Sequence, residues 1–393
     1  MVPIVIIVIT SLLLIAYLFD ITSKKTSIPS AILLLFLGFG LKQIFNYSHI
    51  EIPDFTSALP ILGTIGLILI VLEGALEIEF NKSKIPLIKK SFWGGLLPII
   101  SMAIILSLLF HLIGGFGFKI SLINAIPLCV ISSAIAIPSV RNLTTSKKEF
   151  VIYESSFSDI LGVLIFNFFA LNETIGFTSV LFFVLQIVII CIISLISIVG
   201  LAILLNKITN HVKFVPIILL ILLIYAVMKV YHLPALIFIL LFGLFVNNID
   251  EIKSFKLINK LRPAHLNREI QKFKDLIIEG TFIIRSLFFL LFGFLIETNE
   301  LLNVDTFLWS IAIVIIIILI RIVQLKLSNL PILPLLFIAP RGLITILLFL
   351  SISPIQRIDI VNKSLITQII CITALFLTVG LMYSKRSLKV NKN

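Results

Sequence analysis

The sequence predicts an all-α polytopic membrane protein with about thirteen transmembrane helices. Sixty per cent of its 393 residues are hydrophobic and only 13% are charged, and its mean hydropathy is +1.21. Such values are typical of chains with many apolar runs of roughly 20 residues, the length that crosses a bilayer as a helix. A soluble protein could not bury so many apolar runs in one core.

The apolar runs, taken in order, predict the thirteen spans. They cover residues 3–19, 28–46, 57–79, 95–117, 120–140, 150–171, 179–206, 214–230, 233–248, 276–296, 303–325, 330–352 and 364–383. The ninth span is short, and a mixed-charge linker from Asp250 to Asp275 precedes the tenth.

The lysines and arginines between the spans indicate on which side each loop lies. Of the 31 in the chain, 23 fall in odd-numbered loops or after the last span, and only 5 in or beside even-numbered loops. Because cytoplasmic loops are enriched in lysine and arginine, we expect the N-terminus outside the cell (inner) membrane and the C-terminus in the cytoplasm. The same distribution accounts for the net charge of +12 without a nucleic-acid partner.

Two of the spans are expected to be discontinuous. Pro138 lies inside the fifth span, and Pro340 and Gly342 lie inside the twelfth. A proline inside a membrane helix removes a backbone hydrogen bond, and small neighbours let the helix unwind. The two spans are seven apart and therefore run in opposite directions, which predicts inverted repeats whose broken helices cross.

This symmetry gives the predicted domain organisation. Residues 1–171 form the first repeat (spans 1–6) and residues 213–384 the second (spans 8–13). Residues 172–212 form a linker span, and residues 385–393 a short cytoplasmic tail.

The sixth span carries the candidate binding site. Glu154, Ser155, Ser158, Asp159 and Gly162 fall within about 140° of the helix circumference. A charge at the centre of a bilayer costs about 2.5 to 3.5 kcal/mol on insertion scales, so such residues face a bundle interior or a water-filled path. Their carboxylate and hydroxyl oxygens are hard ligands of the kind that sodium, lithium or potassium needs.

Three arginines also lie inside apolar runs. Arg321 lies near the cytoplasmic end of its span and is predicted to extend to the membrane surface. Arg285 and Arg341 lie deeper and need partners. An ion pair between Arg285 and Glu73 is one interpretation, and a Glu73 wetted at a helix end is the other.

Cysteine and histidine provide no sign of a metal centre or a cofactor. The three cysteines lie singly in apolar runs, and the five histidines are scattered, mostly at loop edges. We therefore expect no cofactor.

Several short segments, in order along the chain, resemble those of the monovalent cation/proton antiporters, in particular the sodium/proton exchanger branch. The stretch 154–159, followed by Gly162, is similar to the Glu-Ser-x-x-Asn-Asp signature of that family. Segments 28–38, 72–78, 288–293 and 340–343 resemble further family motifs. The likeness extends over nearly the whole chain.

The resemblance implies roles for particular residues. Asp159 would be the carboxylate that binds either a cation or protons, Ser155 and Glu154 would lie beside the ion, and Arg341 would pair with Glu154. It also implies a homodimer.

Two departures from the family pattern affect the site. Ser158 replaces the usual asparagine, and Ala136 and Ile137 replace the usual Thr-Asp before Pro138. We expect carbonyl oxygens of unwound backbone near Ala136 to act as ligands instead.

These observations predict a secondary antiporter, and not an enzyme, in which a monovalent cation and protons compete for Asp159. Because only Asp159 is left to titrate, we expect one cation to exchange for one proton. A sodium-coupled solute symporter of similar design is the main alternative. An intramembrane enzyme is less favoured because the sequence has no HExxH or GxSxG motif and no paired catalytic aspartates, and a channel because no filter-like repeat is visible.

Overall fold

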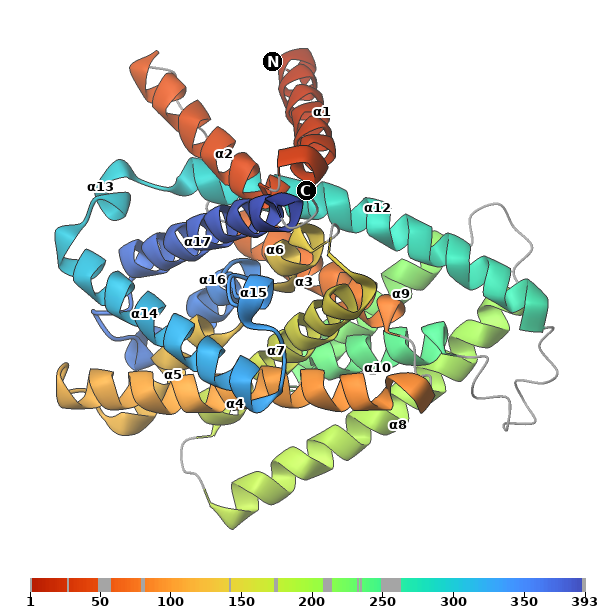
Figure 1. Cartoon of the computed structure of the whole chain (residues 1–393). Helices are drawn as coiled ribbons and strands as arrows, with labels where there is room; N and C mark the ends of the chain where they lie inside the picture. The colour runs from red at the N-terminus through yellow and green to blue at the C-terminus, as the bar shows by residue number, and fades with distance from the viewer. Residues whose placement is uncertain are drawn as a thin grey trace.

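The computed structural model describes residues 2–26, 28–48, 58–78, 82–140, 143–172, 176–207, 214–231, 233, 235–248 and 263–390. Within these ranges the chain is almost entirely helical and contains no β-strand (Figure 1).

The helices fall into two halves along the chain. The first half contains α1 (Val2–Thr26), α2 (Ser30–Tyr47), α3 (Ala58–Glu77), the 3-10 turn η1 (Lys82–Lys84), α4 (Ile85–Leu112), α5 (Phe118–Cys129), α6 (Ser133–Ser139), α7 (Thr145–Leu171) and α8 (Phe177–Lys207). The second half contains α9 (Phe214–Val230), α10 (Ala235–Asn247), α12 (Pro263–Leu295), α13 (Thr298–Leu301), α14 (Val304–Leu327), α15 (Ile332–Leu335), α16 (Leu343–Ser351), the 3-10 turn η2 (Pro354–Gln356) and α17 (Lys363–Val390).

Each predicted span coincides with a helix or with a broken pair of helices. Ten segments of the described chain are long and apolar enough to cross a membrane, and α9 and α10 are shorter apolar helices. The prediction of an all-α polytopic membrane protein is therefore confirmed.

Several helices extend beyond the predicted spans, and two of them, α12 and α17, enter the predicted linker and tail. Helix α12 begins at Pro263, so the second part of the predicted linker is helical, and α17 continues to Val390 through most of the predicted tail. Residues 250–262 and 391–393 of these two predictions lie outside the described residues. The reason is that a hydropathy pattern ends at the first charges, whereas a helix continues into water as long as its backbone hydrogen bonds form.

The helices pack as two bundles that lie side by side (Figure 1). One contains α4 to α7 and α14 to α17, and the other contains α1 to α3, α8 to α10 and α12. Helix α3 connects them, because it contacts α7 and α16 as well as α10 and α12. Each bundle thus takes helices from both predicted repeats.

Close packing of α2 on α12 explains the glycines that end two of the family-like segments, 28–38 and 288–293. A Cβ atom added at Gly38 would collide with the backbone carbonyl of Leu290, and one added at Gly293 would collide with that of Leu35. Glycine at both positions lets the two backbones touch, as is common between membrane helices.

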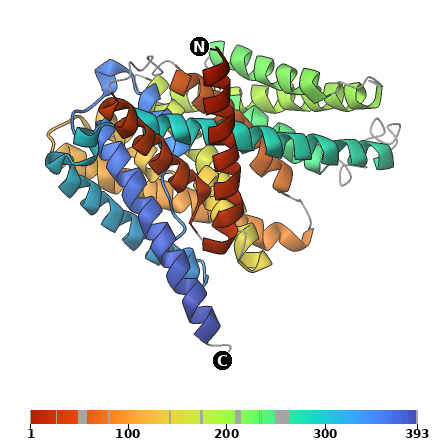
Figure 2. The ribbon, with the colours of Figure 1, turned by 90° about the horizontal axis from the view of Figure 1, so that it is seen from above.

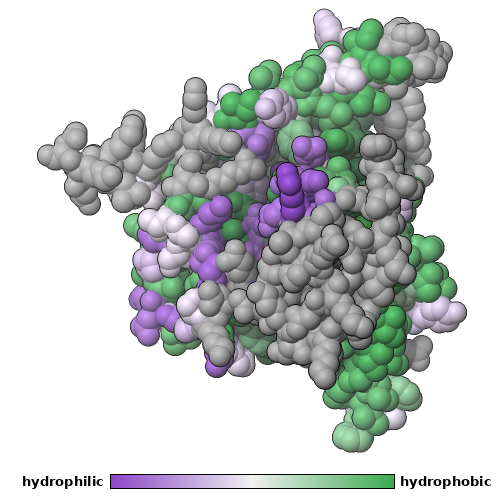
Figure 3. All heavy atoms as spheres, turned by 90° about the vertical axis from the view of Figure 1, so that its right-hand side faces the viewer, coloured by the Kyte–Doolittle hydropathy of each residue, from purple (hydrophilic) through white to green (hydrophobic). Residues whose placement is uncertain are grey.

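The outer surface has the polarity expected of a membrane protein. Large hydrophobic side chains are exposed along α1 and α8, for example Ile7 at 62% and Phe182 at 62%. Helix α1 lies on the outside of the molecule, and α17 extends away from it to the C-terminus (Figure 2). Hydrophilic residues gather on the face in Figure 3, with hydrophobic surface around them.

Candidate functional site

The fifth predicted span is broken between α5 and α6. Residues 130–132 are extended there, with ψ of 130° at Val130 and 112° at Ser132. The Ile131 N–H donates a hydrogen bond to Ser158 Oγ at 2.9 Å, and the Ser132 N–H donates to the Pro340 carbonyl at 2.9 Å. These bonds satisfy the backbone groups that a helix would otherwise pair, so the chain can unwind inside the membrane.

The position of this break corrects two predictions. Pro138 does not break the helix: it lies inside α6, near its end, where the lost N–H removes a single bond. Ala136 is helical too, and its carbonyl accepts the Ser139 hydroxyl at 2.7 Å. The unwound backbone lies at Val130–Ser132 instead, where Ser158 and the Pro340 carbonyl accept hydrogen bonds from its N–H groups.

The second break lies between α15 and α16 and contains Pro340 and Gly342, as predicted. A Cβ at Gly342 would approach Ser132 Oγ to 2.8 Å, so glycine lets the two breaks meet. Together with the hydrogen bond between Ser132 and Pro340, this contact shows the crossing of two discontinuous helices that the sequence predicts.

Asp159 lies beside the first break. The α7 helix buries it to 2% exposure, and the Ser133 hydroxyl, in the first turn of α6, donates a hydrogen bond to Asp159 Oδ2. The other carboxylate oxygen, Oδ1, is buried and has no hydrogen-bond partner in the described structure. One oxygen is therefore held in place while the other remains available.

The other two predicted serines have different environments. Ser158 Oγ accepts the Ile131 N–H and so fixes the break against α7. Ser155 is fully buried and donates to the Ile152 carbonyl of its own helix at 3.3 Å. It lies four residues before Asp159 and hence on the same helix face.

Glu154 belongs to a separate cluster. Arg321, on α14, binds it with both terminal nitrogens, at 2.5 Å to Oε1 and 2.8 Å to Oε2. The Gln324 amide donates to Oε1 at 2.9 Å. Glu154 is 1% exposed and Arg321 is 2% exposed, so this is a buried, two-pronged ion pair.

Two predictions about arginines are therefore wrong. Arg321 does not extend to the membrane surface, and Arg341 does not pair with Glu154. Arg321 also donates to the carbonyls of Leu335 at 3.1 Å and Ile338 at 3.2 Å. Both carbonyls lie at or just after the end of α15, where the Leu335 carbonyl also accepts the Ile338 N–H at 3.1 Å. A guanidinium with five N–H groups can bind them and the carboxylate together.

A sequence signal for Arg321 was present. Arg321 and Gln324 lie about three and four helical turns after Ser310, on the same face of α14, and all three are buried. Ser133 had no comparable signal, because its contact with Asp159 depends on the position of the break.

Arg341 stabilises the ends of the broken helices. Its Nε donates to the Leu128 carbonyl in the last turn of α5 at 2.6 Å, and Nη1 donates to the Ala339 carbonyl at 3.0 Å. A cation at a helix C-terminus compensates the partial negative charge of the free carbonyls. Its charge thus balances backbone dipoles and not a carboxylate.

Arg285 remains separate from both clusters. It is 8% exposed and makes no hydrogen bond or ion pair with any residue that the structure describes. Gly66 faces Ile284, and Gly280 faces Leu69, so α3 and α12 are antiparallel there. This register places Glu73 about eight residues, or roughly 12 Å, from the level of Arg285, and their predicted ion pair does not form.

The site thus combines one carboxylate with a free oxygen and two arginines whose donors are engaged elsewhere. Asp159 Oδ1 and the Ser155 hydroxyl belong to the same face of α7, the Ser133 hydroxyl binds the other oxygen of Asp159, and the extended backbone of Val130–Ser132 precedes Ser133. Such a group can take up a proton or a small hard cation.

Comparisons with known proteins place this geometry in a family. The chain is similar in structure to the sodium proton antiporter MjNhaP1 from Methanocaldococcus jannaschii. One structure of that protein, at pH 8, matches with a TM-score of 0.65 and 17% identity over 98% of this chain and 99% of the other. A second, from electron microscopy, matches with a TM-score of 0.70 and 15% identity over 98% and 96%.

Sequence comparison agrees with the fold. No curated protein matches the sequence. The family model described as "Sodium/hydrogen exchanger, transmembrane" matches residues 9–385, and its members are transporters, not enzymes. The chain therefore belongs to the sodium/hydrogen exchanger family of membrane cation/proton antiporters.

Proposed function

We propose that the protein exchanges sodium for protons by competition at Asp159. The observation that carries this proposal is the buried Asp159 carboxylate, with Oδ2 bound to Ser133 and Oδ1 without a partner among the described residues. A carboxylate that holds either a proton or a cation, but never both, couples the two flows.

The oxygens around Asp159 support a monovalent cation as the second substrate. Ser133 and Ser155 are buried hydroxyls on adjoining helices, and the break at Val130–Ser132 contributes carbonyls. Lithium and potassium are also oxygen-binding cations, and sodium is the member that the family name specifies.

The small free volume near the site favours an ion over an organic solute. The cavity that Ser158 and Arg321 help to line has a volume of about 10 Å³, which is room for roughly one water molecule. A symporter for an organic solute needs a larger cavity.

We expect one cation to exchange for one proton. Glu154 is bound by Arg321 and Gln324, and it therefore stays ionised through the cycle. Asp159 alone exchanges a proton for a monovalent cation, and the carboxylate has no net charge with either of them bound.

The test is exchange by purified protein in liposomes with a clamped membrane potential. The pH at which an imposed sodium gradient balances should not change with voltage. A net charge moved per cycle would feel about 2.3 kcal/mol per 100 mV, and a shift of roughly half a pH unit or more would contradict the one-carboxylate mechanism.

We also propose an orientation in the membrane and an oligomeric state. The positive charges of the loops support a location in the cell membrane with the C-terminus on the cytoplasmic side. Labelling of single cysteines from each side of the membrane would test this orientation. The exposed apolar side chains of α1, such as Leu14 at 66%, support a homodimer through spans 1–3 and 8–10, which the mass of the detergent-solubilised particle would test.

A further inference from the structure

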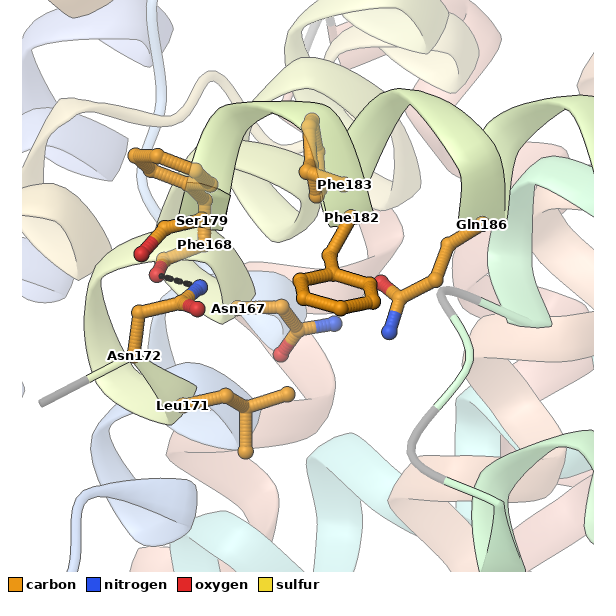
Figure 4. Close-up of a pocket in the computed structure, with 8 residues that line it drawn as sticks. All are labelled: Asn167, Phe168, Leu171, Asn172, Ser179, Phe182, Phe183 and Gln186. Carbon is orange, nitrogen blue, oxygen red and sulfur yellow. Dashed lines mark hydrogen bonds between the residues drawn. The ribbon is translucent and has the colours of Figure 1, made fainter. Parts of the chain in front are cut away.

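A cavity of about 390 Å³ opens between the end of α7 and the beginning of α8 (Figure 4). Asn167 is the lining residue of α7 that is nearest in sequence to Asp159, and it lies about 12 Å further along the helix, at 1.5 Å per residue. The cavity is thus separate from the carboxylate at which we propose the exchange. The oxygens that hold the cation must come from the side chains packed around Asp159.

Ser156, on α7, has a buried hydroxyl that no described residue binds. Its side chain is 6% exposed, and Ser156 Oγ lies among the buried oxygens without a hydrogen-bond partner in the described structure. The neighbouring serines differ, because Ser155 donates to the Ile152 carbonyl at 3.3 Å and Ser158 accepts from the Ile131 N–H at 2.9 Å. A buried hydroxyl without a partner costs free energy, so Ser156 is suited to a ligand.

Ser156 lies beside Asp159 on the surface of α7. Residues three apart in a helix are neighbours, with Cβ atoms about 5 to 6 Å from one another. Around the helix, Asp159 lies between Ser155 and Ser156, about 40° from the first and about 60° from the second. Asp159 Oδ1 is itself a buried oxygen without a partner among the described residues. A small ion between Asp159 Oδ1 and Ser156 Oγ would satisfy both oxygens.

Helix α3 provides the space for the Ser156 hydroxyl. A Cβ atom added at Gly74 would lie 2.8 Å from Ser156 Oγ and 3.8 Å from Ser156 Cβ. The hydroxyl is therefore directed toward α3, and only a residue without a Cβ leaves room for it there. Since α7 and α3 belong to different bundles, Ser156 lies at the interface between the two bundles.

We propose that the Ser156 hydroxyl oxygen is a ligand of the cation that binds Asp159. This inference rests on the proposed exchange at Asp159 and adds a residue to its site. With sodium bound, Asp159 Oδ1 and Ser156 Oγ both contact the ion. When a proton replaces sodium, the protonated carboxyl donates a hydrogen bond to Ser156 Oγ. Either occupant thus joins the same two oxygens, and no group besides Asp159 changes its protonation.

Sodium binding to the purified full chain in detergent, measured by isothermal titration calorimetry, tests the proposal. We expect Ser156→Ala to weaken sodium binding about tenfold, because the contact of a charged group with a single hydroxyl is worth about that factor. Ser194→Ala is the matched control, since Ser194 is also fully buried and its hydroxyl donates to the Ile190 carbonyl of its own helix at 2.7 Å. Equal sodium affinities of Ser156→Ala and wild type would overturn the proposal.

A sulfur substitution separates a ligand from a residue that only supports the fold. Ser156→Cys keeps the shape of the side chain and replaces its oxygen with sulfur, which hard cations bind poorly and soft cations bind well. Sodium binding should weaken, whereas binding of thallium(I), a soft monovalent cation, should weaken less or strengthen. A structural role would change both affinities equally, and that result would contradict the assignment.

Gly74 gives a second, independent variant. Gly74→Ala forces the Ser156 hydroxyl to turn away and should weaken sodium binding in the wild-type background. In the Ser156→Ala background it should have little further effect, because 3.8 Å between the two Cβ positions is an ordinary contact. The two changes should therefore be non-additive, and additive effects would contradict the proposed position of the hydroxyl.

Asp159→Asn in the same measurement distinguishes this proposal from the proposed function. Sodium binding that survives Asp159→Asn would contradict the exchange site itself, and with it the role of Ser156. Sodium binding that is lost in Asp159→Asn but unchanged in Ser156→Ala would contradict the role of Ser156 alone.

Discussion

The two carboxylates of α7 lie five residues apart and have opposite environments. Glu154 has partners for both oxygens, from Arg321 and Gln324. In the part of the chain that the structure describes, Asp159 has one partner, Ser133, and one buried oxygen without any. A saturated carboxylate holds helices together, whereas an unsaturated one can exchange its occupant. Burial alone therefore does not show which carboxylate can bind an ion. What distinguishes the two is whether both carboxylate oxygens already have hydrogen-bond partners.

The largest effect expected from this comparison is at Asp159. Asp159→Asn keeps the shape of the side chain but removes the group that binds a proton or a cation, so exchange should be abolished while the protein still folds. Sodium-dependent proton movement in sealed proteoliposomes measures this. Glu297→Gln, the matching change at a carboxylate outside the site, should leave exchange near the wild-type level. Exchange by Asp159→Asn above about a tenth of the wild-type rate would show that another group carries the ion.

The next effect concerns the saturated carboxylate. Removing either Glu154 or Arg321 leaves an uncompensated buried charge, which typically costs about 3 to 5 kcal/mol, whereas removing both costs less than the sum. Glu154→Gln, Arg321→Gln and the double variant should therefore give non-additive changes in melting temperature.

Arg341 supplies the control for that cycle. Arg341 binds backbone carbonyls and not Glu154, so Glu154→Gln and Arg341→Gln should combine additively. Coupling between Glu154 and Arg341, and none between Glu154 and Arg321, would reverse the assignment made from the structure.

Hydropathy and charge predicted the spans because bilayer thickness and loop charge act on each segment separately. The polar stripe of α7 was visible for a similar reason, since helical periodicity is local. Asp159 and Glu154 could thus be found without a structure.

The pairing of the arginines could not be predicted in this way. It depends on which carbonyls lie at the second break, and nothing in the sequence marked those of Leu335 and Ile338 as partners of Arg321. The isoleucine-rich α14 also lacks an apolar periodicity. Its buried face could therefore not be recognised in the sequence, except at Ser310, Arg321 and Gln324. Similarly, Pro138 was an ambiguous marker, because a helix ends where its N–H groups find other partners.

A smaller effect should separate Ser133 from the other hydroxyls near Asp159. Ser133→Ala removes the hydroxyl that donates to Asp159 Oδ2, and a hydrogen bond to a charged group contributes roughly 1.5 to 3 kcal/mol. We expect exchange to persist with an apparent sodium affinity changed about tenfold, measured as the concentration that gives half the maximal rate. Ser139→Ala is the matched control on the same helix, because the Ser139 hydroxyl donates only to the Ala136 carbonyl. Equal effects of the two changes would remove Ser133 from the site.

The smallest effect concerns a carboxylate that is ion-paired in water. Glu297, between α12 and α13, accepts a hydrogen bond from the Lys42 ammonium at 2.7 Å, and its side chain is 54% exposed. The Lys42 hydrogen bond and charge lower the Glu297 pKa below its usual value of 4.5. The pKa of Glu297 is lower in the folded than in the unfolded protein, so the pair stabilises the fold above about pH 4.5. This contribution is lost as the pH falls through the folded pKa.

Exposure limits the size of this contribution to at most about 1 kcal/mol, since solvent and salt screen the pair. We expect Glu297→Gln to lower the melting temperature slightly at pH 7, and the difference from wild type to vanish in high salt and once the pH is below the folded pKa of Glu297. The Glu154→Gln difference should be insensitive to salt, because Arg321 and Glu154 are shielded from solvent. A Glu297→Gln effect as large as that of Glu154→Gln, or one independent of salt, would mean that burial does not distinguish the two ion pairs.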